Sequence, residues 1–247
     1  MRAADVRTVM WKELREQADV FTGGSRAQLL GIGFVAIFFG VISPLRGGAG
    51  WFTNGAGLFS YAFVGTVLLM QPVADVFAGE RERHTLETLL STRLNDASIL
   101  LGKLFGVLLP VWLLTLLVYV VAIVATNIEY GHGQLLLPPA WSVLTTLAAI
   151  VLVPGLIACI GVFVSMRSDT VRKAAQVLSF IVMGIFFLPL ILSEVLPRDL
   201  RARVLLLLND SSPRSLGLVV AAALLVIEVG LIAVALARFR RGRMALD

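Results

Sequence analysis

Charged residues are scarce in this chain of 247 residues, and that scarcity excludes an ordinary water-soluble domain. Asp, Glu, Lys and Arg together make up 15% of the sequence, whereas a soluble domain usually has about a quarter. Hydrophobic residues make up 58%, and the mean hydropathy is +0.90. The composition therefore predicts an integral membrane protein.

Cysteine and histidine are also nearly absent, which argues against most metal and nucleophilic sites. The single cysteine, Cys159, falls inside a predicted span, so neither a disulfide nor a cysteine metal cluster is expected. The histidines, His84 and His132, fall on opposite sides of the membrane in the topology given below, so they cannot share a metal ion. No Gly-x-Ser-x-Gly turn is present, and Ser60 has no evident base. We therefore expect no metal site, and an intramembrane hydrolase is the less favoured alternative.

A phosphate-binding loop is missing from the sequence as well. Such a loop needs Gly-x-x-x-x-Gly-Lys-[Ser/Thr], in which backbone amides and the lysine surround the phosphates. The one Gly-Lys pair, Gly102–Lys103, is followed by Leu104 and has Ala97 at the first glycine position. We therefore expect that the chain is not an ATPase and that it binds no cofactor itself.

The apolar residues form six segments, each long enough to cross a membrane as a helix, which takes about 20 residues. These segments are continuously apolar rather than alternating, so membrane strands are not expected. The predicted fold is all-α: one integral membrane domain over residues 1–247 with six transmembrane helices. The predicted spans are 27–45, 57–78, 104–126, 142–166, 174–193 and 216–237. The glycine-rich segment 46–57 is expected to be a flexible turn.

The distribution of Lys and Arg predicts the orientation of the chain in the membrane. Sixteen of the 21 basic residues lie in the N-terminal segment, in the connections after the second and fourth spans, or in the tail. Because basic residues favour the cytoplasmic side, both termini are expected in the cytoplasm, with the chain in the plasma (inner) membrane. Basic residues beside anionic lipid account for the isoelectric point near 10.0. No nucleic-acid partner is needed to explain it.

Residues 3–21 are expected to form an amphipathic helix within an interfacial segment that extends to residue 26. Apolar side chains repeat along one face at steps of three or four: Val6, Met10, Leu14, Ala18 and Phe21. Such a helix most simply lies flat on the membrane, with Trp11 at the depth of the lipid headgroups. The alternative is a second contact with a cytoplasmic partner.

A charged segment between the second and third spans is the most informative part of the chain. Leu86, Leu89 and Leu90 share one helical face, and charged residues precede and flank them. An apolar stripe outside the spans needs a lipid surface or a protein groove to cover it. The residues predicted to form this docking surface are Glu80, Arg81, Glu82, Arg83, Thr85, Leu86, Glu87, Leu89 and Leu90.

The segment GERERHTLETLLSTRLNDASILLGK, residues 79–103, resembles the signature of type-2 ABC transporter permeases. In that family the second span ends in a Glu-x-Glu pair. Thr-Leu-Glu, a Leu-Leu pair, a polar turn and a Gly-Lys that enters the third span then follow. The matching positions here are Glu80 and Glu82, Thr85 to Glu87, Leu89 and Leu90, and Gly102 with Lys103. Two positions depart from the family, because His84 stands where glycine is frequent and Arg93 stands near a frequent proline.

The resemblance implies that residues 79–92 are a coupling helix that docks into a separate cytoplasmic ATP-binding subunit. It also implies two copies of that subunit, which bind ATP and magnesium, and a dimer formed with a second copy of the permease, the alternative being a heterodimer with a related permease. Most members of the family export their substrates, so an exporter is expected. The alternative is a non-transporting membrane component that uses the ATPase for mechanical signalling or assembly.

Glu228 is the acidic residue near the middle of a predicted span. A carboxylate at that depth is costly and usually faces the protein interior or a water-filled path. It is therefore a candidate for the translocation path or for a proton-linked site. The alternative is a neutral or hydrogen-bonded carboxyl that packs against another helix.

Asp75 and Gln71 are candidates for gating, because both lie near the end of the second span beside the charged segment. Asp75 is expected to pair with Lys103 or Arg81, in a structural or a gating role. Gly102 and Gly106 form a small-residue step at the start of the third span. Such a step permits two helices to approach closely.

Overall fold

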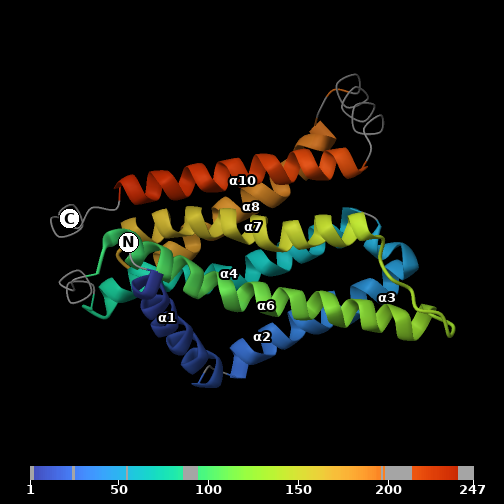
Figure 1. Cartoon of the computed structure of the whole chain (residues 1–247), viewed down its shortest axis with the longest axis horizontal. Coiled ribbons are helices and arrows are strands. Elements are labelled where there is room, and N and C mark those ends of the chain that lie inside the picture. Colours follow the sequence, from blue (N-terminus) through green and yellow to red (C-terminus); the bar gives the residue numbers. More distant parts are fainter. Residues whose placement is uncertain are drawn as a thin grey trace.

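The computed structural model describes residues 3–23, 26–53, 55–85, 94–195, 197 and 213–238. Every regular element within these ranges is a helix and none is a strand (Figure 1), which confirms the predicted all-α class. The elements are α1 Ala3–Gly23, α2 Arg26–Ile37, the π-helix η1 Phe38–Ile42, α3 Ser43–Gly47, the 3-10 helix η2 Gly48–Phe52, α4 Gly55–Glu82, α6 Asp96–Tyr130, α7 Ala140–Arg167, α8 Val171–Val195 and α10 Pro213–Arg238.

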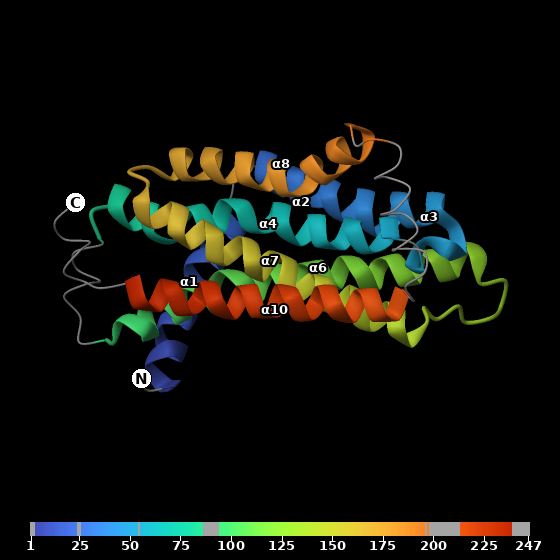
Figure 2. The same cartoon turned by 90° about the horizontal axis from the view of Figure 1, so that it is seen from above.

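The long helices run roughly along one axis, and α1 crosses them at one end (Figure 1). Seen from above, α4 and α7 lie between α8 on one side and α10 on the other (Figure 2). α4 is central because it packs against α6, α7 and α8. Its buried face carries Leu69, Val73 and Phe77, which share one apolar core with Ile99 of α6 and Ile157 of α7.

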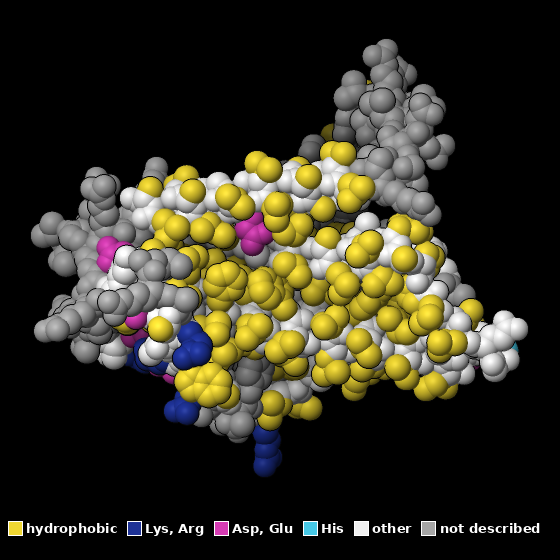
Figure 3. All heavy atoms as spheres, viewed as in Figure 1, with side chains coloured by type: hydrophobic (Ala, Val, Ile, Leu, Met, Phe, Trp, Pro, Cys, Tyr) yellow, Lys and Arg dark blue, Asp and Glu magenta, His cyan; other side chains and the backbone are white. Residues whose placement is uncertain are grey.

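Within the described residues, five helical segments are long and apolar enough to cross a membrane: Leu29–Gly47, Gly55–Glu82, Asp96–Tyr130, Ala140–Arg167 and Gly217–Ala237. They coincide with five of the predicted spans. The remaining prediction, 174–193, lies within α8, and its crossing of the membrane stays a prediction. Apolar side chains cover the face of the bundle in Figure 3. Several apolar helices with such a surface are typical of a multi-pass membrane protein.

The ends of the helices are arranged as the predicted topology requires. α1, the end of α4, the turn between α7 and α8, and the end of α10 all lie at one end of the bundle (Figures 1 and 2). We refer to this as the α1 end. The connection between α6 and α7 lies at the opposite end. The side of the membrane that the α1 end faces stays a prediction.

The segment 46–57 differs from the flexible turn expected of it, because most of it is helical. Trp51 of η2 is buried, and its Nε1 donates a hydrogen bond to the hydroxyl of Tyr61 at 3.1 Å. A Cβ at Gly47 or Gly57 would collide with Trp51. Gly47 makes room for the indole ring of Trp51 and Gly57 for its backbone carbonyl, so these glycines allow close packing rather than chain flexibility.

Residues 86–93 lie outside the described residues, and they include Leu86, Glu87, Leu89 and Leu90 of the predicted coupling helix. Residues 79–82, predicted to begin that helix, form the last turn of α4 instead. α4 then ends in a Schellman motif, with the Thr85 amide bonded to the Glu80 carbonyl at 2.9 Å and the His84 amide bonded to the Arg81 carbonyl at 3.1 Å.

His84 occupies the left-handed position of that motif, with φ +56°. Glycine adopts this conformation without a steric penalty. His84 therefore adopts a backbone conformation that glycine, the residue which the family resemblance implies at this position, would adopt with less strain.

Candidate functional site

The last turn of α4 is the candidate site, because consecutive side chains from Glu80 to Arg83 contact different parts of the bundle. In a helix each residue is rotated by about 100° from the one before. Neighbouring side chains therefore point in different directions, and one turn can contact helices on several sides.

Glu80 connects α4 to α1 and α6. Its side chain is 4% exposed, and its Oε1 lies 3.1 Å from Lys12 Nζ and 3.2 Å from Lys103 Nζ. Thr85 donates a hydrogen bond to the other carboxylate oxygen. Lys103 is 1% exposed and makes a second ion pair with Glu13 of α1. A buried ammonium group is thus held between two carboxylates from two different helices.

Arg81 and Glu82 bind the turn that joins α7 to α8. The Arg81 guanidinium donates hydrogen bonds to the carbonyls of Ser168 at 2.7 Å and Met166 at 3.0 Å. A cation at this position satisfies carbonyls left free at the end of α7 and opposes the negative end of its dipole. Glu82 accepts a hydrogen bond from the Val171 amide, the first residue of α8, at 3.4 Å.

Arg83 pairs with Asp75 on the surface of α4, where Nη2 and Oδ2 lie 3.2 Å apart. The expected pairing of Asp75 with Lys103 or Arg81 is therefore wrong. Lys103 is already bound by two glutamates and Arg81 by backbone carbonyls, which leaves Arg83 as the partner. Because both side chains are about half exposed, the pair contributes only about 0–1 kcal/mol. Gln71, one turn earlier on α4, is exposed.

α1 docks on the start of α6 through the glycine step. A Cβ at Gly102 would lie 2.6 Å from Val9 Cβ, and one at Gly106 would lie 2.5 Å from Glu13 Cβ. Gln17 continues the contact by donating to the Gly106 carbonyl at 3.3 Å. The prediction that these glycines permit a close helix approach is confirmed, and the helix that approaches is α1.

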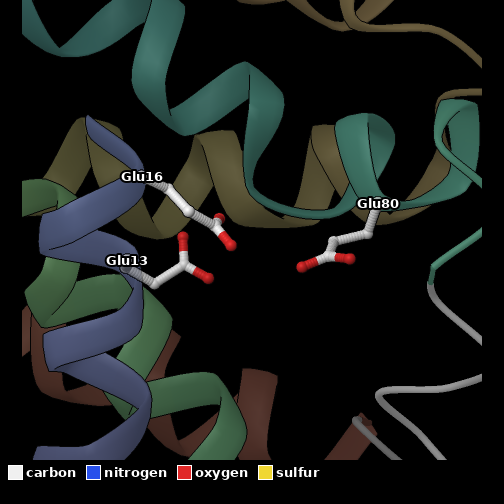
Figure 4. A group of neighbouring side chains, drawn as sticks. All are labelled: Glu13, Glu16 and Glu80. Carbon is white, nitrogen blue, oxygen red and sulfur yellow. The ribbon is translucent and has the colours of Figure 1, made fainter. Parts of the chain in front are cut away.

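Five charged side chains meet where α1, α4 and α6 converge, and we call them the charge cluster: Lys12, Glu13, Glu16, Glu80 and Lys103. Figure 4 shows the three carboxylates pointing toward one another, two from α1 and one from α4. One oxygen from each carboxylate lies within 4.8 Å of the other two, a spacing that would suit a cation. The two lysine ammonium groups supply positive charge there, and the arrangement is that of an ion-pair network.

Burial and charge shift the titration of the α1 members of the cluster. Burial raises the pKa of Glu13, and the ion pair with Lys103 only partly opposes this. Burial alone would lower the pKa of Lys12, but the carboxylates of Glu80 and Glu16 outweigh it and raise that pKa. The cluster therefore favours a charged Lys12, and Glu13 takes up a proton more readily than an exposed glutamate.

Glu228 lies apart from the charge cluster, on α10. Its side chain is half-buried, and its carboxylate covers Gly155 of α7 so closely that a Cβ there would collide with it. Figure 3 shows an acidic side chain between α10 and α7 in the middle of the apolar face. Within the described part of the chain, the Glu228 carboxylate makes no ion pair or hydrogen bond. The structure thus turns Glu228 toward another helix, and its role in a translocation path or a proton-linked site stays a prediction.

Three members of the charge cluster were not candidates from the sequence, namely Lys12, Glu13 and Glu16. A signal was present for Glu13, because Val9, Glu13 and Gln17 follow one another at steps of four. That spacing matches the four-residue step between Gly102 and Gly106 on the helix that they contact.

The fold and the site define a class, a multi-pass helical membrane protein whose helix ends are joined by one charged turn. Comparison with known proteins narrows this class. Residues 12–210 match the family described as ABC-2 family transporter protein. The chain belongs to this family, as the residue signature predicted.

One relative among curated proteins is the ABC transporter permease protein NatB of Bacillus subtilis (strain 168). This chain is 31% identical to it over 125 residues, which make up 48% of this chain and 31% of NatB. The similarity therefore spans about half of this chain and about a third of the relative.

Proposed function

We propose that this chain is the permease subunit of an ATP-driven exporter. Two copies would form the translocation path, and two copies of a separate cytoplasmic ATP-binding subunit would drive it. Membership of the ABC-2 family supports a transporter component, and similarity to a protein named as a permease supports this role within it. The sequence has no phosphate-binding loop, so the proposal assigns ATP hydrolysis to the partner.

The observation that carries the proposal is the set of contacts made by the last turn of α4. This turn directly precedes the leucine stripe of residues 86–90, which the family resemblance assigns to the coupling helix. A displacement there would reach α1 and α6 through Glu80, α7 through Arg81 and α8 through Glu82. Because closely packed helices move as rigid units, one small segment would move most of the bundle.

In this proposal the ATP-binding subunits close on ATP and move the coupling segment of each permease. The buried ion pairs of Lys103 keep α1 and α6 aligned with α4 during that movement. Glu228 is the candidate for the translocation path, since it combines mid-span depth with a carboxylate turned toward α7. Asp75 and Gln71 lie on the exposed side of α4 close to its end and are candidates for gating.

The docking step is tested by replacing the leucine stripe. In Leu86→Asp/Leu89→Asp, two carboxylates enter the predicted contact with the ATP-binding subunit, where burying an unpaired charge is costly. We expect this variant to insert in the membrane but to lose co-purification of the ATP-binding subunit.

The matched control is Leu135→Asp/Leu137→Asp, which changes two exposed leucines at the opposite end of the bundle. This control variant should still co-purify with the ATP-binding subunit. Full co-purification with both variants would show that the stripe is not the docking surface.

Export is tested in inside-out vesicles that contain the assembled complex. An exporter should accumulate substrate in these vesicles only when ATP is added. Drugs, lipids, polysaccharides, ions and peptides are the classes to compare, with stimulation of ATP hydrolysis as the first readout. A complex that hydrolyses ATP but moves none of these classes would favour the non-transporting alternative.

A further inference from the structure

α1 has two different faces, and among the described residues only one of them packs against the bundle. Val9 and Glu13 are buried against α6. The opposite side presents Arg7, Trp11 and Arg15 at intervals of four residues, which places them in one row along the helix. The Trp11 side chain is 57% exposed, and the Arg15 guanidinium lies 5.4 Å from the centre of its indole ring.

This outward row is basic. Arg7 and Arg15 form no ion pair with any carboxylate among the described residues. Among the acidic side chains of α1 that the structure describes, Glu13 is paired with Lys103, Glu16 is bound to Lys12 at 3.1 Å, and Asp5 is only partly exposed. Basic side chains gather at the edge of the bundle where α1 lies and α2 begins (Figure 3). The row therefore has positive charge available for a partner outside the chain.

The contacts of α1 set its depth relative to the apolar spans. It crosses α6 at Gly102 and Gly106, where the predicted third span begins at residue 104. It contacts α4 at Glu80, two positions beyond the predicted end of the second span at residue 78. The middle of α1 thus lies where the apolar surface gives way to charged residues, which is the depth of lipid headgroups.

We propose that the outward row of α1 binds the headgroup of an anionic phospholipid. Arginine forms paired hydrogen bonds with phosphate oxygens, and an indole ring is favoured at the headgroup depth. The charge of the row complements an anionic headgroup. This site requires only that the helices cross a membrane, so it does not depend on the proposed transport function. An acidic groove of a protein is the competing occupant and is one outcome of the test.

The test uses the full chain in vesicles of phosphatidylcholine and phosphatidylglycerol, with either lipid brominated to quench nearby tryptophan fluorescence. The Trp11→Phe variant gives the signal of the other tryptophans, so the difference reports Trp11 alone. We expect brominated phosphatidylglycerol to quench Trp11 more strongly than brominated phosphatidylcholine. The preference should fall by up to about fivefold per arginine removed in Arg7→Gln/Arg15→Gln.

Two variants serve as controls. Arg46→Gln/Arg172→Gln removes the same charge from exposed positions outside α1 and should leave the preference unchanged. Arg7→Lys/Arg15→Lys keeps the positive charge and should therefore keep most of the preference for brominated phosphatidylglycerol. Equal quenching by both lipids, or a preference that survives in Arg7→Gln/Arg15→Gln, would overturn the proposal. Absence of quenching by either lipid would overturn it in favour of a protein groove.

Discussion

At the scale of single residues, Lys103 is the most tightly constrained charge in the described structure. Its ammonium group is buried between Glu13 and Glu80. Removing one member of a buried ion pair leaves uncompensated charge and typically costs about 3–5 kcal/mol. We expect Lys103→Met to lower the apparent free energy of unfolding in detergent by that order.

Lys173→Met is the matched comparison for Lys103→Met. Lys173 pairs with Asp169 at 3.0 Å, but both side chains are well exposed. Solvent screens an exposed pair of this kind, so this variant should change stability little. Similar losses in the two variants would mean that the charge cluster does not hold the helices together.

Glu13 should make stability depend on pH. Its pKa is raised in the folded chain, so the folded state binds the proton more tightly than the unfolded state. The stabilising contribution of this group is present at low pH and is lost as pH rises through the raised pKa. The Glu13→Gln variant has no titrating group at this position and therefore serves as the reference. The stability of the unmodified chain relative to Glu13→Gln should therefore fall as pH rises, by at most about 1.4 kcal/mol per pH unit.

Unfolding curves of both proteins over a pH series measure this difference. A difference that stays constant across the range between the ordinary and the raised pKa of glutamate would contradict the expectation. A difference that grows with pH would mean that the attraction to Lys103 outweighs the effect of burial.

At the scale of helices, the docking of α1 depends on two missing side chains. Gly102→Val/Gly106→Val places branched side chains where Val9 and Glu13 now lie. Overpacking of this kind costs about 1–3 kcal/mol, and separation of the helices would also break the ion pair of Glu13. We expect α1 to detach, with faster amide hydrogen exchange in residues 5–18 while α7 keeps its protection.

A control for this variant is available on α2, where Gly31 has open space around the position of a Cβ. Gly31→Val should leave the exchange of α1 unchanged. Unaltered protection of α1 in Gly102→Val/Gly106→Val would show that α1 does not need the close approach.

The sequence was sufficient to predict the helices whose place in the membrane follows from their composition alone. α4, α6 and α7 are long apolar runs, and a run of about 20 such residues has few alternatives to a spanning helix. The partner of α1 could not be predicted in this way, because an amphipathic pattern indicates that a face is covered but not by what. Lipid was the simplest choice for the apolar arc. The structure packs the adjacent side, which bears Val9 and Glu13, against two glycines, and the contact of the apolar arc with lipid stays a prediction.

Pair partners within the site were also beyond prediction from sequence. Asp75 and Arg83 are eight residues apart, so they meet on one helix only because α4 continues without a break to Glu82. The family signature identified Glu80 and Lys103 separately, as the acidic pair and the Gly-Lys step. Their contact depends on how α4 and α6 cross, which local spacing does not contain.

At the scale of the whole molecule, cysteine labelling tests the topology. Cys159 is buried, so cysteines introduced at exposed positions can be read above a low background. His132 lies between α6 and α7, Asp169 lies between α7 and α8, and Pro197 follows α8. An impermeant thiol reagent added to intact cells should label His132→Cys and not Asp169→Cys. Pro197→Cys decides whether α8 crosses.

If α8 is the sixth span, Pro197→Cys will label together with His132→Cys. If Pro197→Cys is labelled only after the membrane has been permeabilised, as is expected for Asp169→Cys, both ends of α8 lie on the same side of the membrane. The chain then has five spans. Reversed labelling of His132→Cys and Asp169→Cys would instead overturn the predicted orientation.

The last turn of α4 has a further consequence for how this chain tolerates change in evolution or engineering. Insertion or deletion of one residue before Glu80 would rotate the following side chains by about 100°. Glu80, Arg81 and Glu82 would then lose their partners together. The number of residues in this helix is therefore constrained more strictly than the identity of any one of them, and substitutions should be accepted here far more readily than changes of length.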